Sequence, residues 1–286
     1  MQTTPSQKTF KNKLLASLPA NAFKQIVAHL APVTLSTDQT LHHPGRAVDT
    51  VYFLEEGICS MVVTLESGAT VEVGRIGRDG FVGMAAILGA GHSPYRFFMA
   101  IPGHGFTIKA NTLLLHTEAS SELRNCLLRS VQSLVVQTAQ TAACNRMHEL
   151  PERLARWLLM CDDRIQIDQA PVTQELLAMM LGTRPSSISV AASALQKGGL
   201  ISYSRGSMKI QNRVGLVEAA CECYQVVSGY SAQQCVRKTG AGHGPARYPV
   251  TRSDHRTHSR QQLKALRQRD VWSDSRISPH KRRRPF

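Results

Sequence analysis

The side chains best suited to binding chemistry gather near the middle of residues 172–201. They combine one guanidinium with three hydroxyls within six positions, and they are Arg184, Ser186, Ser187 and Ser189. Guanidinium and hydroxyl groups donate hydrogen bonds to phosphate oxygens and to the edges of bases. We therefore expect this stretch, with Pro185 inside it, to contact DNA.

Two short helices joined by a tight turn are predicted to position these groups. Apolar residues on either side of Gly182 recur at helical spacing, a pattern typical of a helix-turn-helix. Thr173 suits the N-cap of the first helix, where we count it among the DNA-contacting residues, and Pro185 suits the first turn of the second. Residues 201–210 then predict a two-stranded wing that carries Arg205 and Lys209. The sequence thus predicts a winged helix-turn-helix over residues 148–227.

Brief β-prone runs separated by Gly, Asp and Pro fill residues 33–115. Their spacing predicts an antiparallel barrel or sandwich of short strands, with hairpin turns at Glu56-Gly57 and Ser67-Gly68. Two short helices interrupted by Pro19 are expected to precede the strands. This β-rich domain is placed at residues 10–117.

A long helix is predicted over residues 118–147, because apolar residues recur at threes and fours and no proline occurs before Pro151. Leu123, Leu127 and Leu134 form its stripe. Such a stripe is what a helix from a second chain would fill, so we expect a homodimer along it. A helix that lies on its own β-domain is the alternative.

The last segment, residues 228–286, lacks apolar periodicity. It carries a net charge of +11, against +3 for residues 1–227. A disordered basic tail is expected here, either a natural arm or out-of-frame sequence. The overall fold class is therefore α+β, with a disordered tail.

The rest of the composition argues against several classes of protein. An apolar run long enough for a membrane span is missing, as is a signal peptide. The seven cysteines are scattered, which fits a reducing cytoplasm. Cys221 and Cys223 form the closest pair, but one residue between thiols and no nearby His is poor zinc spacing, so we expect no metal site. Since common catalytic motifs are also missing, we expect neither an enzyme nor a cofactor.

The order of these elements resembles the Crp/Fnr family of bacterial transcription regulators. Its most specific matches are RDGFVGM at 78–84, ERLARWLL at 152–159, TQELLAMMLG at 173–182 and GLISYSRG at 199–206. The resemblance covers about residues 10–227. It implies a cyclic-nucleotide-binding-type β-roll, a dimerising helix, and a winged helix that binds a palindromic operator. RNA polymerase is an implied candidate partner, and no membrane is involved.

The effector segment departs from the pattern of family members that bind cyclic AMP. In those members a Glu follows the motif's glycine and holds the ribose, and an Arg about ten positions later pairs with the cyclic phosphate. Here Gly83 is followed by Met84 and Ala85, and Ser93 stands where the Arg is expected. We therefore expect no cyclic AMP in the usual mode, although Arg96 in a shifted loop is an alternative phosphate ligand.

Other sensor types of the family fit no better. An Fnr-type iron–sulfur sensor needs cysteines near the N-terminus, and the first one here is Cys59. A haem would rely on His29 or the His42-His43 pair, which we interpret as surface residues. The small-molecule effector, if the chain has one, is left unidentified.

The second helix of the helix-turn-helix also departs from the family, whose base-contacting pattern there is Arg-Glu-x-x-x-Arg. The matching positions are Pro185, Ser186 and Val190, with Arg184 one place earlier. The family's operator sequence therefore does not carry over. The leading hypothesis is a sequence-specific transcription regulator. The alternatives are a ligand-sensing β-roll that acts on a protein partner, and sequence-blind binding of nucleic acid by the basic tail.

Overall fold

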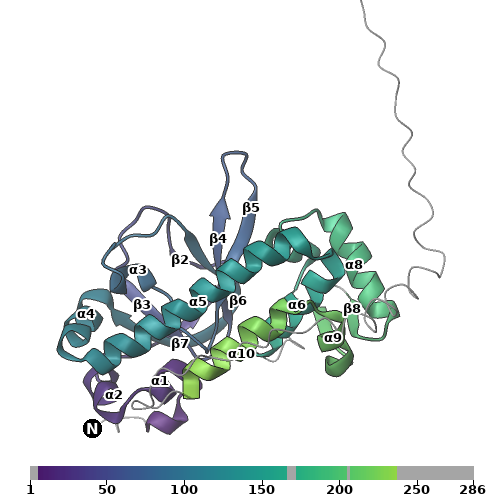
Figure 1. Ribbon diagram of the computed structural model, residues 1–286. Coiled ribbons are helices and arrows are strands. Elements are labelled where there is room, and N and C mark those ends of the chain that lie inside the picture. Colours follow the sequence, from purple (N-terminus) through teal and green to yellow (C-terminus); the bar gives the residue numbers. More distant parts are fainter. Residues whose placement is uncertain (1–5, 166–171, 205–206, 237–286) are drawn as a thin grey trace, which may run out of the picture. The chain divides into compact units, whose positions relative to one another are not determined.

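The computed structural model describes residues 6–165, 172–204 and 207–236 (Figure 1). They all belong to a unit formed by residues 1–243, while the second unit, 244–286, lies outside the described residues, as does most of the predicted tail. The helices are η1 (Gln7–Thr9), α1 (Lys13–Ser17), α2 (Ala20–Val27), α3 (Met84–Ile87), α4 (Ala110–Ala119), α5 (Ser121–Met147), α6 (Leu150–Asp162), α7 (Gln174–Leu181), α8 (Pro185–Lys197), α9 (Arg213–Ala219) and α10 (Cys223–Val236). The strands are β1 (Ala31–Leu35), β2 (Thr40–His42), β3 (Thr50–Leu54), β4 (Ile58–Thr64), β5 (Thr70–Ile76), β6 (Arg96–Ile101), β7 (Gly103–Lys109), β8 (Ile201–Ser204) and β9 (Ser207–Ile210).

Two antiparallel sheets build the N-terminal β-roll, in the orders β1-β7-β3 and β2-β6-β4-β5. The predicted hairpin turn at Ser67-Gly68 is confirmed, because it joins the paired strands β4 and β5. The hairpin expected at Glu56-Gly57 is wrong, since β3 and β4 lie in different sheets. Gly57, with φ at 91°, instead lets the chain cross from one sheet to the other.

The long helix is present as α5, which starts at the N-cap Ser120. The Ser120 hydroxyl accepts a hydrogen bond from the backbone N–H of Leu123 at 3.3 Å. α5 packs against β5, where Gly74 leaves room for the side chain of Leu134. Among the described helices, none is long and apolar enough to cross a membrane.

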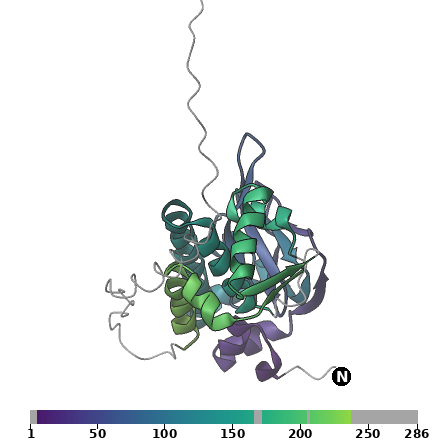
Figure 2. The same cartoon turned by 90° about the vertical axis from the view of Figure 1, so that its right-hand side faces the viewer.

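The winged unit follows α5 and shares a core with the β-roll. Apolar residues of β4 and β6, such as Ile58 and Phe98, lie in one cluster with those of α6, α7 and α8. Figure 2 views the molecule from the side of this unit. The expected α+β architecture of β-roll, long helix and winged helix-turn-helix is confirmed.

A buried polar network crosses the same junction. The Glu72 carboxylate accepts from Ser60 at 2.6 Å and from the Arg75 guanidinium at 2.5 Å. Arg75 also donates to the backbone carbonyl of Trp157 at 3.0 Å and lies over its indole ring. Since both charged side chains are less than a tenth exposed, each depends on its partners to offset the cost of leaving water.

The C-terminal boundary differs from the sequence prediction. The folded part was expected to end at residue 227, but after α9, which ends at Ala219, α10 begins at Cys223 and continues to Val236. The first nine residues of the predicted tail are therefore helical. α10 packs along α5, as Figure 1 shows, so it belongs to the folded unit.

Candidate nucleic-acid interface

The turn between α7 and α8 is built by local hydrogen bonds that the sequence predicts. The Thr173 hydroxyl accepts from the backbone N–H of Leu176 at 3.1 Å, which confirms it as the N-cap. Gly182 takes the left-handed conformation, with φ at 58°, and ends α7. Pro185 occupies the first turn of α8. The apolar residues of both helices, including Leu177 and Ile188, are buried against each other.

The start of α8 presents the expected contact groups to solvent. Arg184, Pro185 and Ser186 are exposed, and Ser187 is half-buried. Pro185 has no backbone N–H, and the N–H groups of Ser187 and Ile188 donate to the Arg184 carbonyl at 3.0 and 3.2 Å, so the donors on this surface are mainly side chains. The arrangement suits an acceptor-rich ligand such as a phosphodiester backbone.

Ser189 is placed differently from its neighbours. Its hydroxyl donates to the side-chain oxygen of Gln174 at 2.9 Å and lies 3.2 Å from the backbone carbonyl of Pro185. It therefore links α7 to α8, and its capacity to contact a base is reduced. The exposed side chain one position later is Val190, with 57% of its surface open.

The wing is partly described. β8 and β9 pair from Ile201 with Ile210 to Ser204 with Ser207. Lys209 is exposed on β9, and Arg205 lies outside the described residues. The backbone N–H of Tyr203 donates to the side chain of Gln196 at 2.9 Å, which joins the wing to the end of α8.

The expected effector segment begins at Gly83, which precedes the short helix α3. Gly83 has φ at 117°, and a Cβ there would lie 3.0 Å from Val51 and 3.4 Å from His42. Ala85 is buried, and Met84 packs against the apolar core. This part of the roll is thus lined by apolar side chains of the chain itself.

Ser93 and Arg96 do not complete a phosphate site there. Ser93 is buried, and its hydroxyl accepts from the backbone N–H of Tyr95 at 3.2 Å. The Arg96 guanidinium donates to Thr40 at 3.1 Å and lies 4.6 Å from the Phe98 ring. Because side chains alternate along β6, Arg96 shares the face of Phe98, opposite to the face that packs near Met84. Arg96, the alternative phosphate ligand, thus lies on the opposite face of β6 from Met84.

The expectation that these histidines lie at the surface is wrong for His42. His42 was expected at the surface but is 6% exposed, between the rings of Tyr52 and Phe97. Its Nε2 lies 2.8 Å from the carbonyl of Thr50, to which it donates. Burial lowers the pKa of His42, which favours the neutral ring.

The predicted dimer seam is occupied by the chain's own β-roll. Leu123 and Leu127 are at most 1% exposed and pack with α1, α2 and β3, while Leu134 is 9% exposed and packs against the roll. These leucines leave no surface for a partner, so the alternative, a helix lying on its own β-domain, accounts for them. The exposed apolar side chains of α5 include Leu128 and Val135.

Two segments of the chain match models of known protein families. Residues 32–113 match the model of the cyclic nucleotide-binding domain, and residues 152–219 match that of the Crp-like helix-turn-helix domain. The global nitrogen regulator of Nostoc sp. strain PCC 7120 is 22% identical over 211 residues, which cover 69% of this chain and 94% of the relative.

Solved structures give the same fold. FixK2 from Bradyrhizobium japonicum matches with a TM-score of 0.58 at 16% identity, covering 67% of this chain and 98% of its own. A CRP-family transcriptional regulator from Thermus thermophilus matches with a TM-score of 0.55 at 19% identity, covering 66% and 96% of the two chains.

Proposed function

This chain belongs to the Crp/Fnr family of transcription regulators, and we propose that it binds a palindromic operator in double-stranded DNA as a homodimer, with α8 as the reading helix. The observation that carries the proposal is the solvent-exposed start of α8, where Arg184, Pro185 and Ser186 are all exposed. A helix N-terminus with this chemistry suits the major groove.

The exposed side chains of α8 also point to the kind of bases it reads. Arg184 suits guanine, and the Ser186 hydroxyl suits several base edges. Val190 takes the place of the family's second Arg, and its exposed methyl groups suit the methyl group of thymine. Lys209 and Arg205 of the wing would contact phosphates. The proposed operator therefore differs from those read by two arginines.

Selection of binding sites from random duplexes tests this function directly. The full chain should enrich a two-fold symmetric sequence with half-sites one helical turn apart. Enrichment of no sequence, together with a protein partner bound at the helix-turn-helix, would favour the alternative of a sensor that acts on a protein. Equal affinity for every duplex would favour sequence-blind binding.

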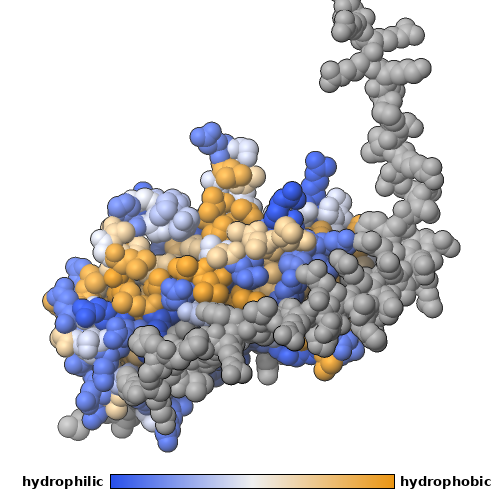
Figure 3. Space-filling model, in the orientation of Figure 1, coloured by the Kyte–Doolittle hydropathy of each residue, from blue (hydrophilic) through white to orange (hydrophobic). Residues whose placement is uncertain are grey.

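We place the dimer contact one position away from the predicted seam. Residues on an exposed stripe of α5 follow each other at spacings of four and three, which is typical of a coiled-coil seam. The stripe consists of Leu128, Gln132, Val135, Ala139 and Ala142. Figure 3 shows an apolar surface that runs over α5 on this face of the molecule. A second copy of α5 would bury this surface.

Two glutamate substitutions separate the fold from the dimer. Val135→Glu should leave the melting temperature nearly unchanged and convert the dimer to a monomer in light scattering, because Val135 is 54% exposed in the single chain. Leu127→Glu should unfold the β-roll, since it buries a charge at a cost of about 3 kcal/mol or more. A Val135→Glu protein that keeps the mass of a dimer would contradict this seam.

The proposal includes no catalytic step and no cyclic AMP in the usual mode. Met84, Ser93 and Arg96 supply no ribose or phosphate partner in one place, so an effector of another chemistry, or none, is consistent with the site. RNA polymerase is a further proposed partner. Because operator DNA lies in the cytoplasm of bacteria, the proposed place of action is the cytoplasm.

A further inference from the structure

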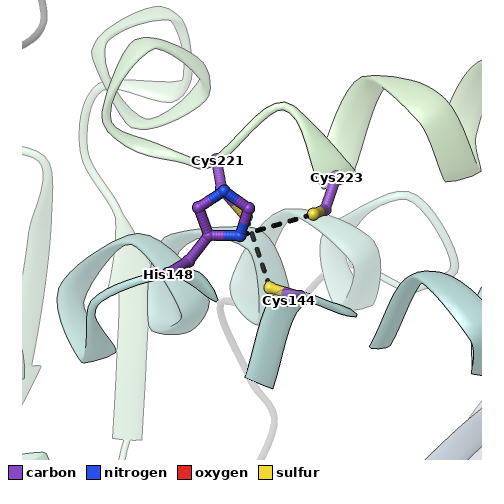
Figure 4. Close-up of side chains that lie close together, drawn as sticks. All are labelled: Cys144, His148, Cys221 and Cys223. Atoms are coloured by element: carbon purple, nitrogen blue, oxygen red, sulfur yellow. Dashed lines mark hydrogen bonds between the residues drawn. The ribbon is translucent and has the colours of Figure 1, made fainter. Parts of the chain in front are cut away.

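Four side chains of metal-ligating type meet where α5 ends. Cys144 and His148 are four residues apart at the C-terminal end of α5, while Cys221 precedes α10 and Cys223 is its first residue (Figure 4). Their three sulfur atoms and the nearest ring nitrogen all lie within 4.8 Å of one another. Two segments far apart in the sequence thus bring three thiols and an imidazole to one point.

Two of the distances between these atoms lie near those of tetrahedral ligands. Cys144 Sγ lies 3.4 Å from Cys221 Sγ, and Cys223 Sγ lies 3.6 Å from His148 Nδ1. Zinc bonds of about 2.3 Å to sulfur and about 2.0 Å to nitrogen place tetrahedral ligand atoms about 3.5–3.8 Å apart. A cation at the centre therefore needs only small shifts of these side chains.

The histidine ring is already oriented for coordination. Its Nε2 lies 3.1 Å from the Glu222 carboxylate, to which an N–H on Nε2 can donate, while Nδ1 faces Cys223. A proton held on Nε2 by a carboxylate leaves the lone pair on Nδ1 free to bind a metal, the arrangement typical of histidine ligands of zinc. Glu222 lies between the two cysteines, so the same turn supplies ligands and the residue that orients one.

The sulfur atoms are buried and lie close to one another. The three cysteines are at most 6% exposed. The side-chain amide of Gln140 donates to Cys223 at 3.1 Å. A divalent cation would bind these sulfur atoms as thiolates, and the thiol protons would be released to solvent.

We propose that Cys144, His148, Cys221 and Cys223 bind one Zn²⁺ ion in a tetrahedral site. Four protein ligands leave no open position, which is typical of structural rather than catalytic zinc. Bound zinc would fasten the turn before α10 to the end of α5, next to the start of α6. The sequence argued against metal because no His is near Cys221 along the chain, but the fold brings His148 there.

Metal analysis of the full chain, purified under reducing conditions, tests the site. We expect one zinc per chain. After dialysis against a competing chelator, Cys144→Ser and Cys223→Ser should each retain at least tenfold less zinc than the wild type. The matched control is Cys126→Ser, which changes a buried cysteine of the same helix outside the cluster and should retain zinc. Equal zinc content in all these variants would overturn the assignment.

Cobalt substitution provides a test that needs no variant to fold. The wild-type chain, stripped of metal and with reduced thiols, should take up one Co²⁺ and show the intense visible bands of a tetrahedral, thiolate-rich site. Zinc should displace the cobalt and raise the melting temperature. Iron with acid-labile sulfide in the purified protein, or a Cys144–Cys221 disulfide with no uptake of cobalt after reduction, would each overturn the zinc proposal.

Discussion

The two regions of this chain expected to bind ligands differ in how much polar surface they leave to a ligand. At the start of α8, Arg184 and Ser186 are exposed. In the segment from Gly83 to Arg96, Ser93 is buried, and Arg96 is held by Thr40 and Phe98. Both regions depart from the family's residues, but only the start of α8 leaves polar side chains exposed to solvent. Where the family's binding residues are replaced, the exposed helix α8 still offers polar groups to a ligand, whereas the packed β-roll does not.

Placing a negative charge on the exposed surface of α8 should have the largest effect on DNA affinity. We expect Val190→Glu to weaken binding to the selected operator by about 100-fold, because a carboxylate would face the phosphates and an apolar base contact would be lost. Fluorescence anisotropy with a labelled operator measures this change. Leu115→Glu, at a 67% exposed position of α4, is the control and should bind as the wild type does. Wild-type affinity of Val190→Glu would show that this face does not meet DNA.

Removal of the guanidinium at the turn should have an intermediate effect. Arg184→Ala is expected to reduce operator affinity about tenfold, which corresponds to about 1.4 kcal/mol. Competition gel shifts with operators altered at one base pair would locate the contact. Arg46→Ala removes an exposed arginine of the β-roll and should leave affinity unchanged. Equal losses for both variants would point to a general effect of charge.

Ser186 and Ser189 of α8 should differ in their effects, one on DNA recognition and the other on stability. Ser186→Ala should change the ranking of operators by a few-fold, since its hydroxyl is exposed. Ser189→Ala should instead lower stability by about 0.5–1.5 kcal/mol, because it loses the hydrogen bond to Gln174. Operator ranking and thermal unfolding, measured on both variants, check this division. A reversed pattern would place Ser189, not Ser186, at the base edges.

Cyclic AMP should have no effect. Calorimetry at physiological nucleotide concentrations should detect no binding heat, and operator affinity should not change. The reason is that Met84 cannot accept the ribose hydroxyl and Ser93 brings no charge to the phosphate. A micromolar dissociation constant would remove the contrast between the two regions and make Arg96 the first residue to mutate.

Local signals made the winged unit predictable. Thr173, Gly182 and Pro185 each determine the backbone within a few residues of themselves, so their roles as cap, turn and first-turn residue follow from the sequence. The stripe of Leu123, Leu127 and Leu134 was predictable as a buried face, but its spacing does not specify whether a sheet or a second chain covers it. The contacts with β5 and α1 decide that question.

Features assembled across long distances were not predictable. The sequence shows Cys144 and His148 as one pair and Cys221 and Cys223 as another, but only the packing of α10 on α5 brings them together. The same packing explains the misplaced boundary at Val227. Residues 228–236 carry little apolar periodicity of their own, and their helix is stabilised by its neighbour rather than by its own pattern.

The buried network of Ser60, Glu72 and Arg75 limits how the parts of this regulator can be exchanged. A chimaera that joins this winged unit to another sensor would remove the partners of the Trp157 carbonyl, and a chimaera that keeps this sensor would leave Arg75 and Glu72 facing a foreign surface. The unit of modularity is therefore larger than the segment 148–236. A chimaera that contains this winged unit therefore also needs the β4–β5 hairpin, which carries the network.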